Sequence, residues 1–276
     1  MTRAVWELPV RLPRSAFTPR DVARAGDAWR LCQEVAVEAS TLAGWPPARY
    51  REEGTAFVVR AMTVRHHREL RYGEALTART WVSRFARGIL SERQIRIVVD
   101  GELAVSATQE WAHVGVELGA GADVRLVPRR GTPELLAAFP DHREAPATTL
   151  PDFAPADGPA SRFELTCWHT WMDPLAHVNH PAYLDWCDES LARRVAAAGL
   201  SPVGLVPVAE RLVFRAGAVA GDRVSVESRL AGSMPDGPLA IRHELRREDG
   251  GLLAEATTVR ALAGGDPDAL LVALSS

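Results

Sequence analysis

The chain has 276 residues, of which 47% are hydrophobic, and a formal net charge of −3. This length allows one large domain or two of ordinary size, and the hydrophobic content is ample for a core. The sequence contains no block of like charge, which argues against a nucleic-acid groove or a polybasic membrane anchor.

Cysteine spacing and hydropathy narrow the cellular setting. Cys32, Cys167 and Cys187 are far apart and form no C-x-x-C pair, which favours a reducing compartment without disulfides and argues against a structural zinc site. Since no run of about 18 apolar residues occurs, we expect no membrane span and a cytoplasmic location.

The first part of the chain predicts a strand, a long helix and four more strands. Residues 5–12 can form a short edge strand, which Pro9 limits. Asp27 can cap a helix that runs to about Ala43, with apolar residues at three- and four-residue spacing on one face. Asp100-Gly101 is a two-residue hairpin signal. The four strands are predicted over residues 56–64, 74–85, 90–99 and 102–114.

A segment rich in proline and glycine follows, from residue 115 to residue 161. Pro133 can open a short helix over residues 133–139. From about residue 144 the composition is that of an extended, semi-rigid linker. We therefore expect a first domain at residues 1–115, a linker at 116–161 and a second domain at 162–276.

The last part of the chain repeats the plan of the first. A helix is predicted from Pro181 to about Ala198, ended by Gly199 in a left-handed cap. Predicted strands cover residues 162–169, 208–214, 222–231, 239–248 and 252–262.

The turns of the two parts also correspond. Gly73-Glu74 falls on Gly221-Asp222, and Asp100-Gly101 falls on Asp249-Gly250, at spacings that agree to within one residue. Turn residues are positions that a shared backbone constrains. The sequence therefore predicts two copies of one fold in tandem.

The stretch from Trp171 to Tyr183 concentrates polar groups next to the second predicted helix. Asp173 and His177 lie four residues apart, and Asn179 precedes the helix that Pro181 opens. A carboxylate, an imidazole and a helix N-terminus thus lie close together, and a helix N-terminus can hold developing negative charge.

The order of elements in each copy resembles the hotdog superfamily, an α+β fold in which a curled antiparallel sheet wraps around one long helix; the tandem pair resembles its double-hotdog form. Asp173, His177, Val178, Asn179 and Tyr183 match the D-x-x-x-H-V-N-N-x-x-Y signature of hotdog acyl thioesterases. Asp173-Pro174 also matches the start of the D-P-x-G run of 4-hydroxybenzoyl-CoA-type thioesterases.

The tandem arrangement is similar to plant-type and bacterial acyl-ACP thioesterases, in which the C-terminal hotdog carries the chemistry. The resemblance implies a thioesterase that acts on an acyl-ACP or acyl-CoA thioester, without a metal or nucleotide cofactor. Three positions depart from the family pattern: Trp171 replaces a second Asp, Leu175 replaces an Asn of the plant-type enzymes, and His180 replaces the second Asn of the signature.

The resemblance and the chemistry together give a set of candidate site residues. Asp173 can act as general base on water or attack the thioester directly to give an anhydride. His177 can donate to the carbonyl or position Asp173, and Asn179 can cap the helix or orient water. Trp171, His180 and Tyr183 are the candidate substrate-binding residues, although Tyr183 can equally be a core residue.

The first copy lacks this constellation, because residues 17–27, the equivalent region, contain no His and no Asn. We expect that copy to be catalytically silent, with one active site per chain at the seam between the halves. A tandem chain can form the hotdog pair internally, so both a monomer and a homodimer are compatible with the sequence.

Two other functions stay open at this point: a hotdog hydratase or dehydratase, and a non-catalytic acyl-thioester-binding protein. The hydratases place an Asn two residues after the Asp and the His five after it, and this chain has neither. A cysteine nucleophile at Cys167 or Cys187 and a metal pair at His66-His67 are disfavoured, since small buried residues are expected at the former and no further ligand spacing supports the latter.

Overall fold

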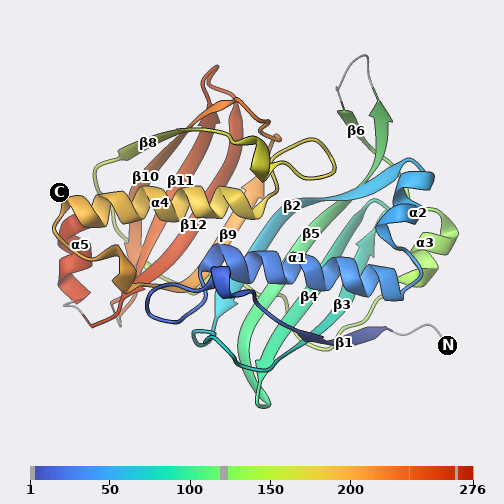
Figure 1. Cartoon of the computed structure of the whole chain (residues 1–276), viewed down its shortest axis with the longest axis horizontal. Helices are drawn as coiled ribbons and strands as arrows, with labels where there is room; N and C mark the ends of the chain where they lie inside the picture. The colour runs from blue at the N-terminus through green and yellow to red at the C-terminus, as the bar shows by residue number, and fades with distance from the viewer. Residues whose placement is uncertain (1–3, 119–123, 236, 265–266, 276) are drawn as a thin grey trace. The chain divides into compact units, whose positions relative to one another are not determined.

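The computed structural model describes residues 4–118, 124–235, 237–264 and 267–275 (Figure 1). By its internal contacts the chain divides into two compact units. The first comprises Met1–Pro13, Ala28–Arg68 and Gly73–Thr149, and the second comprises Arg14–Asp27, Glu69–Tyr72 and Leu150–Ser276. Two short segments from the first part of the chain thus belong to the second unit.

The first unit is an antiparallel sheet with one long helix. Its strands are arranged in the order β1-β3-β4-β5-β2, and β6 pairs with the outer part of β5. Figure 1 shows α1 lying across this sheet. The elements are β1 (Val5–Val10), α1 (Ala25–Leu42), α2 (Pro47–Glu52), β2 (Thr55–His66), β3 (Leu76–Ala86), β4 (Leu90–Val99), β5 (Glu102–Leu118), β6 (Val124–Pro128) and α3 (Pro133–Ala138).

The second unit has the same construction. Its strands are arranged in the order β8-β10-β11-β12-β9, and β7 pairs with the other end of β10. The elements are β7 (Ala154–Pro155), β8 (Ser161–Thr166), α4 (Pro181–Ala197), β9 (Leu205–Phe214), β10 (Arg223–Ser233), β11 (Leu239–Arg247), β12 (Leu252–Leu262) and α5 (Pro267–Ser275), with short 3-10 turns at Arg14–Ala16, His169–Trp171 and Pro202–Gly204.

The two strand orders are identical once β1 to β5 are matched with β8, β9, β10, β11 and β12. The corresponding turns agree in backbone conformation as well. Gly73 and Gly221 have φ of 87° and 90°, and Gly101 and Gly250 both have φ of 85°. Since this left-handed region is one that glycine adopts at little cost, the repeated glycines mark the repeated turns. The tandem double-hotdog fold predicted from the sequence is confirmed.

The predicted apolar faces of the two long helices form the core of their units. On α1, Cys32, Val35 and Ala39 of the predicted face are at most 1% exposed, but Leu42, the last residue of the helix, is 48% exposed, so the prediction is wrong for that position. On α4, the residues of the predicted face are buried in the same way: Leu184, Cys187, Leu191 and Val195. Gly199 has φ of 78° just after α4, as the predicted left-handed cap requires.

Several boundaries differ from the prediction. Helix α1 begins at Ala25, so Asp27 lies inside its first turn and does not cap it. The Gly44–Pro47 run stops α1, but Pro47 also opens α2, because proline is well suited to a first helical turn. The predicted linker contains β6, which extends the sheet along β5, and α5 was not predicted. The short helix at Pro133 is present, with Thr132 capping it.

The three cysteines are free thiols. Within the described residues, no helix is long and apolar enough to cross a membrane.

Candidate active site

The candidate site begins in a tight hairpin just before α4. The N–H of Asp173 donates to the carbonyl of His177 at 2.8 Å, and the N–H of Ala176 donates to the carbonyl of Asp173 at 3.1 Å. Pro174 suits the second position of such a turn. Ala176 has φ of 61°, a left-handed conformation that closes the loop. The hairpin brings the Asp173 and His177 side chains next to each other.

Those two side chains form a close polar pair. Asp173 Oδ2 lies 3.2 Å from His177 Nδ1, while Asp173 Oδ1 accepts a hydrogen bond from the N–H of Leu175 at 2.8 Å. Among the described residues His177 Nδ1 has no aligned hydrogen-bond partner, so the Asp173 contact is a close polar approach and not a linear hydrogen bond. The Asp173 side chain is 15% exposed. Oδ2 is therefore the oxygen available for chemistry.

Burial raises the pKa of the Asp173 carboxyl above its ordinary value. The charge of His177 and the N–H groups of Leu175 and His177 act in the opposite direction, because each stabilises the ionised form. A carboxylate whose pKa is moved upward is a better proton acceptor at neutral pH than an ordinary aspartate.

The imidazole of His177 rests on a loop from another part of the second unit, residues 215–222 between β9 and β10. A Cβ added at Gly217 would lie 3.1 Å from Cβ of His177 and 3.4 Å from its Cγ. The next residue of the chain is tied to the same loop, since the N–H of Val178 donates to the carbonyl of Ala218 at 2.8 Å. The bare Cα of Gly217 thus forms the floor under the His177 ring.

This supporting loop is itself held at three points. Arg247 on β11 donates to the carbonyl of Gly217 at 2.9 Å and to the carboxylate of Asp222 at 3.0 Å. The N–H of Ala218 donates to the hydroxyl of Tyr183 at 2.7 Å. The sequence alone does not indicate roles for Gly217, Ala218 or Arg247, because no local pattern links them to His177.

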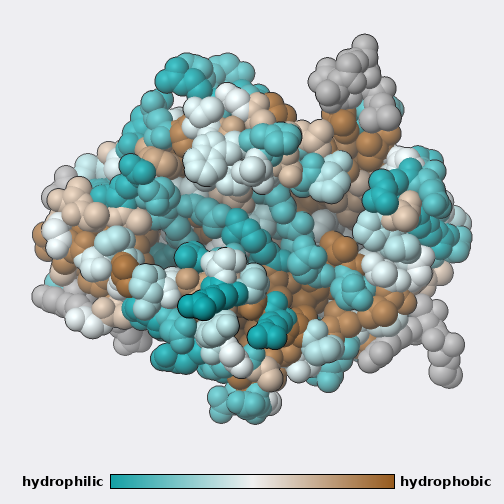
Figure 2. Space-filling model, viewed as in Figure 1, coloured by the Kyte–Doolittle hydropathy of each residue, from teal (hydrophilic) through white to brown (hydrophobic). Residues whose placement is uncertain are grey.

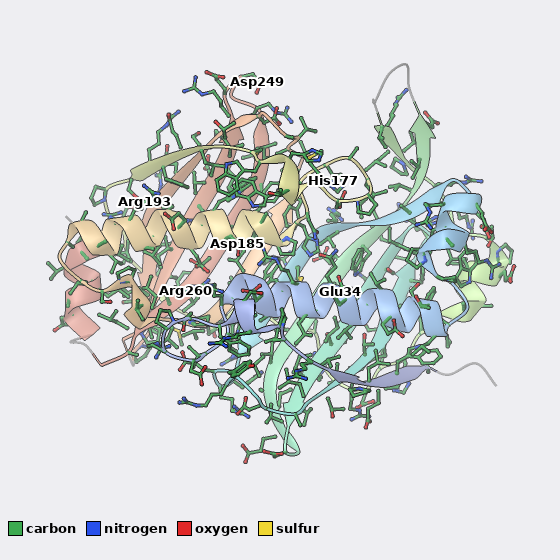
Figure 3. All side chains as sticks on the ribbon, viewed as in Figure 1. Glu34, His177, Asp185, Arg193, Asp249 and Arg260 are labelled. Atoms are coloured by element: carbon green, nitrogen blue, oxygen red, sulfur yellow. The ribbon has the colours of Figure 1, made fainter. Side chains whose placement is uncertain are left out.

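The N-terminus of α4 directly follows the hairpin, and Figure 3 shows His177 beside this end of the helix. The N–H groups of Ala182 and Tyr183 donate to the carbonyls of Asn179 and His180. These two N–H groups at the start of α4 are therefore already engaged. Neither His180 nor Asn179 caps the helix with its side chain, and Asn179 Oδ1 has no hydrogen-bond partner among the described residues.

Aromatic side chains line the other side of the hairpin. Trp168, which is 64% exposed, stacks on Trp171 with ring centroids 5.0 Å apart. Trp171 contacts Trp186 of α4, and Trp186 contacts Tyr183. His180 meets Phe214 edge to face at 5.8 Å. The three candidate substrate-binding residues, Trp171, His180 and Tyr183, therefore all belong to one aromatic cluster beside Asp173.

Tyr183 is the most enclosed member of this cluster, at 2% exposed. Burial raises the pKa of its hydroxyl to about 12, so the group stays protonated at neutral pH. Its oxygen accepts the Ala218 N–H, and in this way Tyr183 links α4 to the loop beneath His177.

Two other kinds of site were considered from the sequence, a cysteine nucleophile and a metal site. Burial raises the pKa of the Cys167 thiol to about 11 and raises that of Cys187 well above its ordinary value, which suppresses the thiolate needed for nucleophilic attack. Among the residues that the structure describes, no group of three or more His, Cys, Asp or Glu side chains could hold a metal ion.

Sequence models of known families match both halves of the chain. Residues 167–264 match the model described as "Thioesterase-like superfamily", and residues 22–91 match the "Thioesterase superfamily" model. The candidate hairpin lies inside the first of these matches. No curated protein matches the sequence.

Solved structures share the fold across almost the whole chain. An oleoyl thioesterase (putative) from Lactobacillus plantarum has a TM-score of 0.73 at 16% identity, covering 95% of this chain and 98% of its own. An acyl-ACP thioesterase from Bacteroides thetaiotaomicron has a TM-score of 0.71 at 12% identity, covering 93% and 97%. The 12:0-ACP thioesterase from Umbellularia californica has a TM-score of 0.70 at 16% identity, covering 94% of each chain. At these identities the likeness establishes the fold.

Proposed function

The chain belongs to the thioesterase superfamily and is an acyl thioester hydrolase, and we propose that Asp173 is its catalytic carboxylate. The observation that carries this proposal is the Asp173–His177 pair at the N-terminus of α4. One carboxylate oxygen is held by the N–H of Leu175, and the other faces the imidazole. Both residues lie in the half that matches the thioesterase-like model.

The geometry favours separate roles for the carboxylate and for the hydrogen-bond donors. Asp173 Oδ2 activates water or attacks the thioester carbonyl, and its raised pKa suits either role. Because the N–H groups of Ala182 and Tyr183 are engaged, side-chain donors are the better candidates to meet the developing oxyanion. We assign that role to His177 and Asn179, which directly precede α4 in the chain.

We further propose that the substrate is an acyl thioester of acyl carrier protein or coenzyme A. Names of two of the structurally similar proteins specify acyl-ACP substrates, which makes ACP the first carrier to test. The aromatic cluster of Trp168, Trp171 and Trp186 supplies apolar surface beside the carboxylate. Such surface suits the acyl part of the substrate.

The test is release of free thiol from a panel of acyl-ACP and acyl-CoA thioesters. Wild-type protein should turn over members of the panel, and Asp173→Asn should lower kcat by about 10²- to 10⁴-fold, the usual contribution of a general base. An unchanged rate for Asp173→Asn would show that another residue is catalytic. If acyl thioesters bind to wild-type protein without turnover, the chain is a binding protein.

Isotope labelling tests for the anhydride mechanism. In ¹⁸O-water, general-base catalysis and hydrolysis of an anhydride at its acyl carbonyl both place the label only in the released acid. Attack by Asp173 forms an anhydride, and water that attacks the aspartyl carbonyl then places ¹⁸O in the Asp173 side chain. Mass spectrometry of the peptide that contains Asp173, after several turnovers, distinguishes these outcomes.

A further inference from the structure

The first unit contains a buried arginine without a counter-ion. Arg93 on β4 and Arg260 on β12 are the two buried arginines of the described chain, at 6% and 2% exposed. Arg260 donates to the carboxylates of Asp188 and Glu210. Arg93 makes one hydrogen bond, from Nη1 to Thr80 Oγ1 at 3.3 Å, and no described carboxylate lies within ion-pair distance of it.

The neighbours of Arg93 do not neutralise its charge. Val82 and Gln109 lie beside it on β3 and β5, and the ring of Phe139 lies 5.5 Å from the guanidinium carbon. Gln109 is already engaged, since its amide donates to Met62 Sδ and its carbonyl accepts from Trp111. Tyr50 is the ionisable group that acts on the pKa of Arg93, but burial raises the pKa of Tyr50 itself to about 12, so it is neutral.

The surroundings are mainly apolar. Val82 and Phe139 belong to a buried cluster with Trp45 and Leu135, against which Tyr50 and Phe57 pack. Figure 2 shows hydrophobic surface beside the C-terminal half of α1, in the same unit. Arg93 is therefore a cation set into an apolar and aromatic environment.

This arrangement is costly for the free protein. Burial lowers the pKa of Arg93 only to about 10, so the side chain stays ionised at neutral pH. A buried charge loses hydration, and the hydrogen bond to Thr80 and the contact with the Phe139 ring compensate only part of that loss. The other guanidinium nitrogens, Nε and Nη2, make no hydrogen bond among the described residues, and neither is fully enclosed.

We propose that Arg93 anchors a binding site in the first unit for a carboxylate on an apolar body, such as a fatty or aryl carboxylic acid. The planar guanidinium fork matches a carboxylate with two parallel hydrogen bonds. The aromatic and aliphatic side chains around it suit the hydrocarbon part. The source of this group is a free acid, the class of compound that thioester hydrolysis releases; this source rests on the proposed function.

Calorimetry with the full-length protein tests the site directly. Sodium decanoate and sodium 2-naphthoate are titrated into wild-type protein, Arg93→Met and Arg93→Lys. Wild type should bind at least one of them, and Arg93→Met should weaken that binding by about 10- to 100-fold, as expected for charge-assisted hydrogen bonds. Arg93→Lys, which keeps the charge but loses the fork, should fall in between. It also serves as the test variant if Arg93→Met does not fold.

Decanol is the matched control ligand, because it has the same chain without the charge. Its binding should be the same in wild type and both variants. Equal binding of the carboxylates by wild type and Arg93→Met, or no binding of either carboxylate by wild type, would overturn the proposal.

Thioester turnover by the same three proteins is measured in parallel, so that a loss of acid binding can be separated from a loss of activity. Failure of all thioester turnover would count against Asp173 and leave the calorimetric result intact.

Discussion

The bare Cα of Gly217 lies against the ring of His177, so close that a Cβ at residue 217 would come within 3.1 Å of the histidine Cβ. The contact joins two loops of the second unit that are far apart in sequence. Real Cβ atoms rarely approach this closely, so any larger residue at position 217 must displace the imidazole. Gly217 is therefore a positioning residue for the candidate catalytic pair.

Gly217→Ala should lower kcat by about 10- to 100-fold with little change in KM, because a displacement of well under 1 Å of a catalytic group is costly. The backbone at residue 217 does not have a positive φ, so alanine fits the main chain. Steady-state kinetics with the best acyl thioester measure the effect. Gly115→Ala adds the same methyl group next to the flexible Arg129 side chain in the first unit, at 3.4 Å, and should leave kcat unchanged.

The activity of the wild-type enzyme should rise with pH through the pKa of Asp173. As a base or nucleophile, Asp173 must be ionised, and burial raises its pKa above the ordinary value of about 3.9. The acidic limb of the kcat/KM profile should therefore lie above pH 4. His177 lowers the pKa of Asp173, so His177→Gln should move this limb to higher pH in its residual activity.

The control for this profile is His169→Gln, since His169 is an exposed histidine in the 3-10 turn just before the hairpin. That variant should reproduce the wild-type curve. An acidic limb at or below about pH 3.9 would contradict the assignment of Asp173.

Ala176→Gly should make the protein more stable. Ala176 has φ of 61°, which costs an alanine about 1–2 kcal/mol and a glycine almost nothing. The greater freedom of glycine in the unfolded chain offsets part of that gain, about 0.5–1 kcal/mol. A net stabilisation of up to about 1 kcal/mol should appear in urea denaturation. Ala196→Gly, at an exposed position in the last turn of α4, should destabilise by about 1 kcal/mol instead.

The sequence was sufficient to predict features that depend on neighbouring residues. Periodicity located β4 and β12 at their observed bounds, and Pro181 marked the first residue of α4. Asp173 and His177 could be paired because one short hairpin carries both. The repeated turn glycines revealed the tandem fold, since only local backbone conformation determines them.

Features that depend on distant contacts could not be predicted in this way. Nothing in the sequence around Gly217 indicates that the His177 ring rests on it, since 40 residues separate the two. The occupation of the Ala182 and Tyr183 N–H groups depends on how the chain enters α4, and the pattern of residue types does not encode this. Strand β6 was not predicted because Val124–Pro128 lies among proline and glycine residues. Its strand conformation depends on backbone hydrogen bonds with β5, which the local sequence does not reveal.

Arg260→Met should destabilise the protein strongly. The buried guanidinium donates to Asp188 of α4 at 2.7 Å and to Glu210 of β9, which is fully buried. Figure 3 labels Arg260 within the second unit. Removing it takes the buried cation away from two carboxylates, a change that costs about 3–5 kcal/mol. Urea denaturation at pH 7.5 measures this loss.

Neutralising both acids should recover part of the loss, so the triple variant with Asp188→Asn and Glu210→Gln should be more stable than Arg260→Met alone. Arg229→Met removes an exposed arginine paired with Glu227 and should have little effect. Equal stabilities of wild type and Arg260→Met would show that the cluster does not hold α4 to the sheet.

His243 should make the protein sensitive to acid. It is fully buried on β11, between the hydroxyls of Ser228 and Thr258, at 2.8 Å and 2.9 Å from its two ring nitrogens. Burial and the nearby Arg260 lower its pKa to about 3. In the unfolded chain the pKa is about 6.5, so the unfolded state binds a proton that the folded state does not.

Above about pH 6.5, His243 is neutral in both states and does not lower the free energy of unfolding. As the pH falls towards 3, the unfolded state takes up a proton at His243, so the free energy of unfolding should decline. The contribution is at most about 1.4 kcal/mol per pH unit. His243→Gln keeps an amide between the two hydroxyls without a titrating group, so its stability should fall less steeply over the same range. Urea denaturation of both proteins between pH 4 and pH 7.5 gives the two slopes. Parallel curves would show that other groups, and not His243, cause the acid sensitivity.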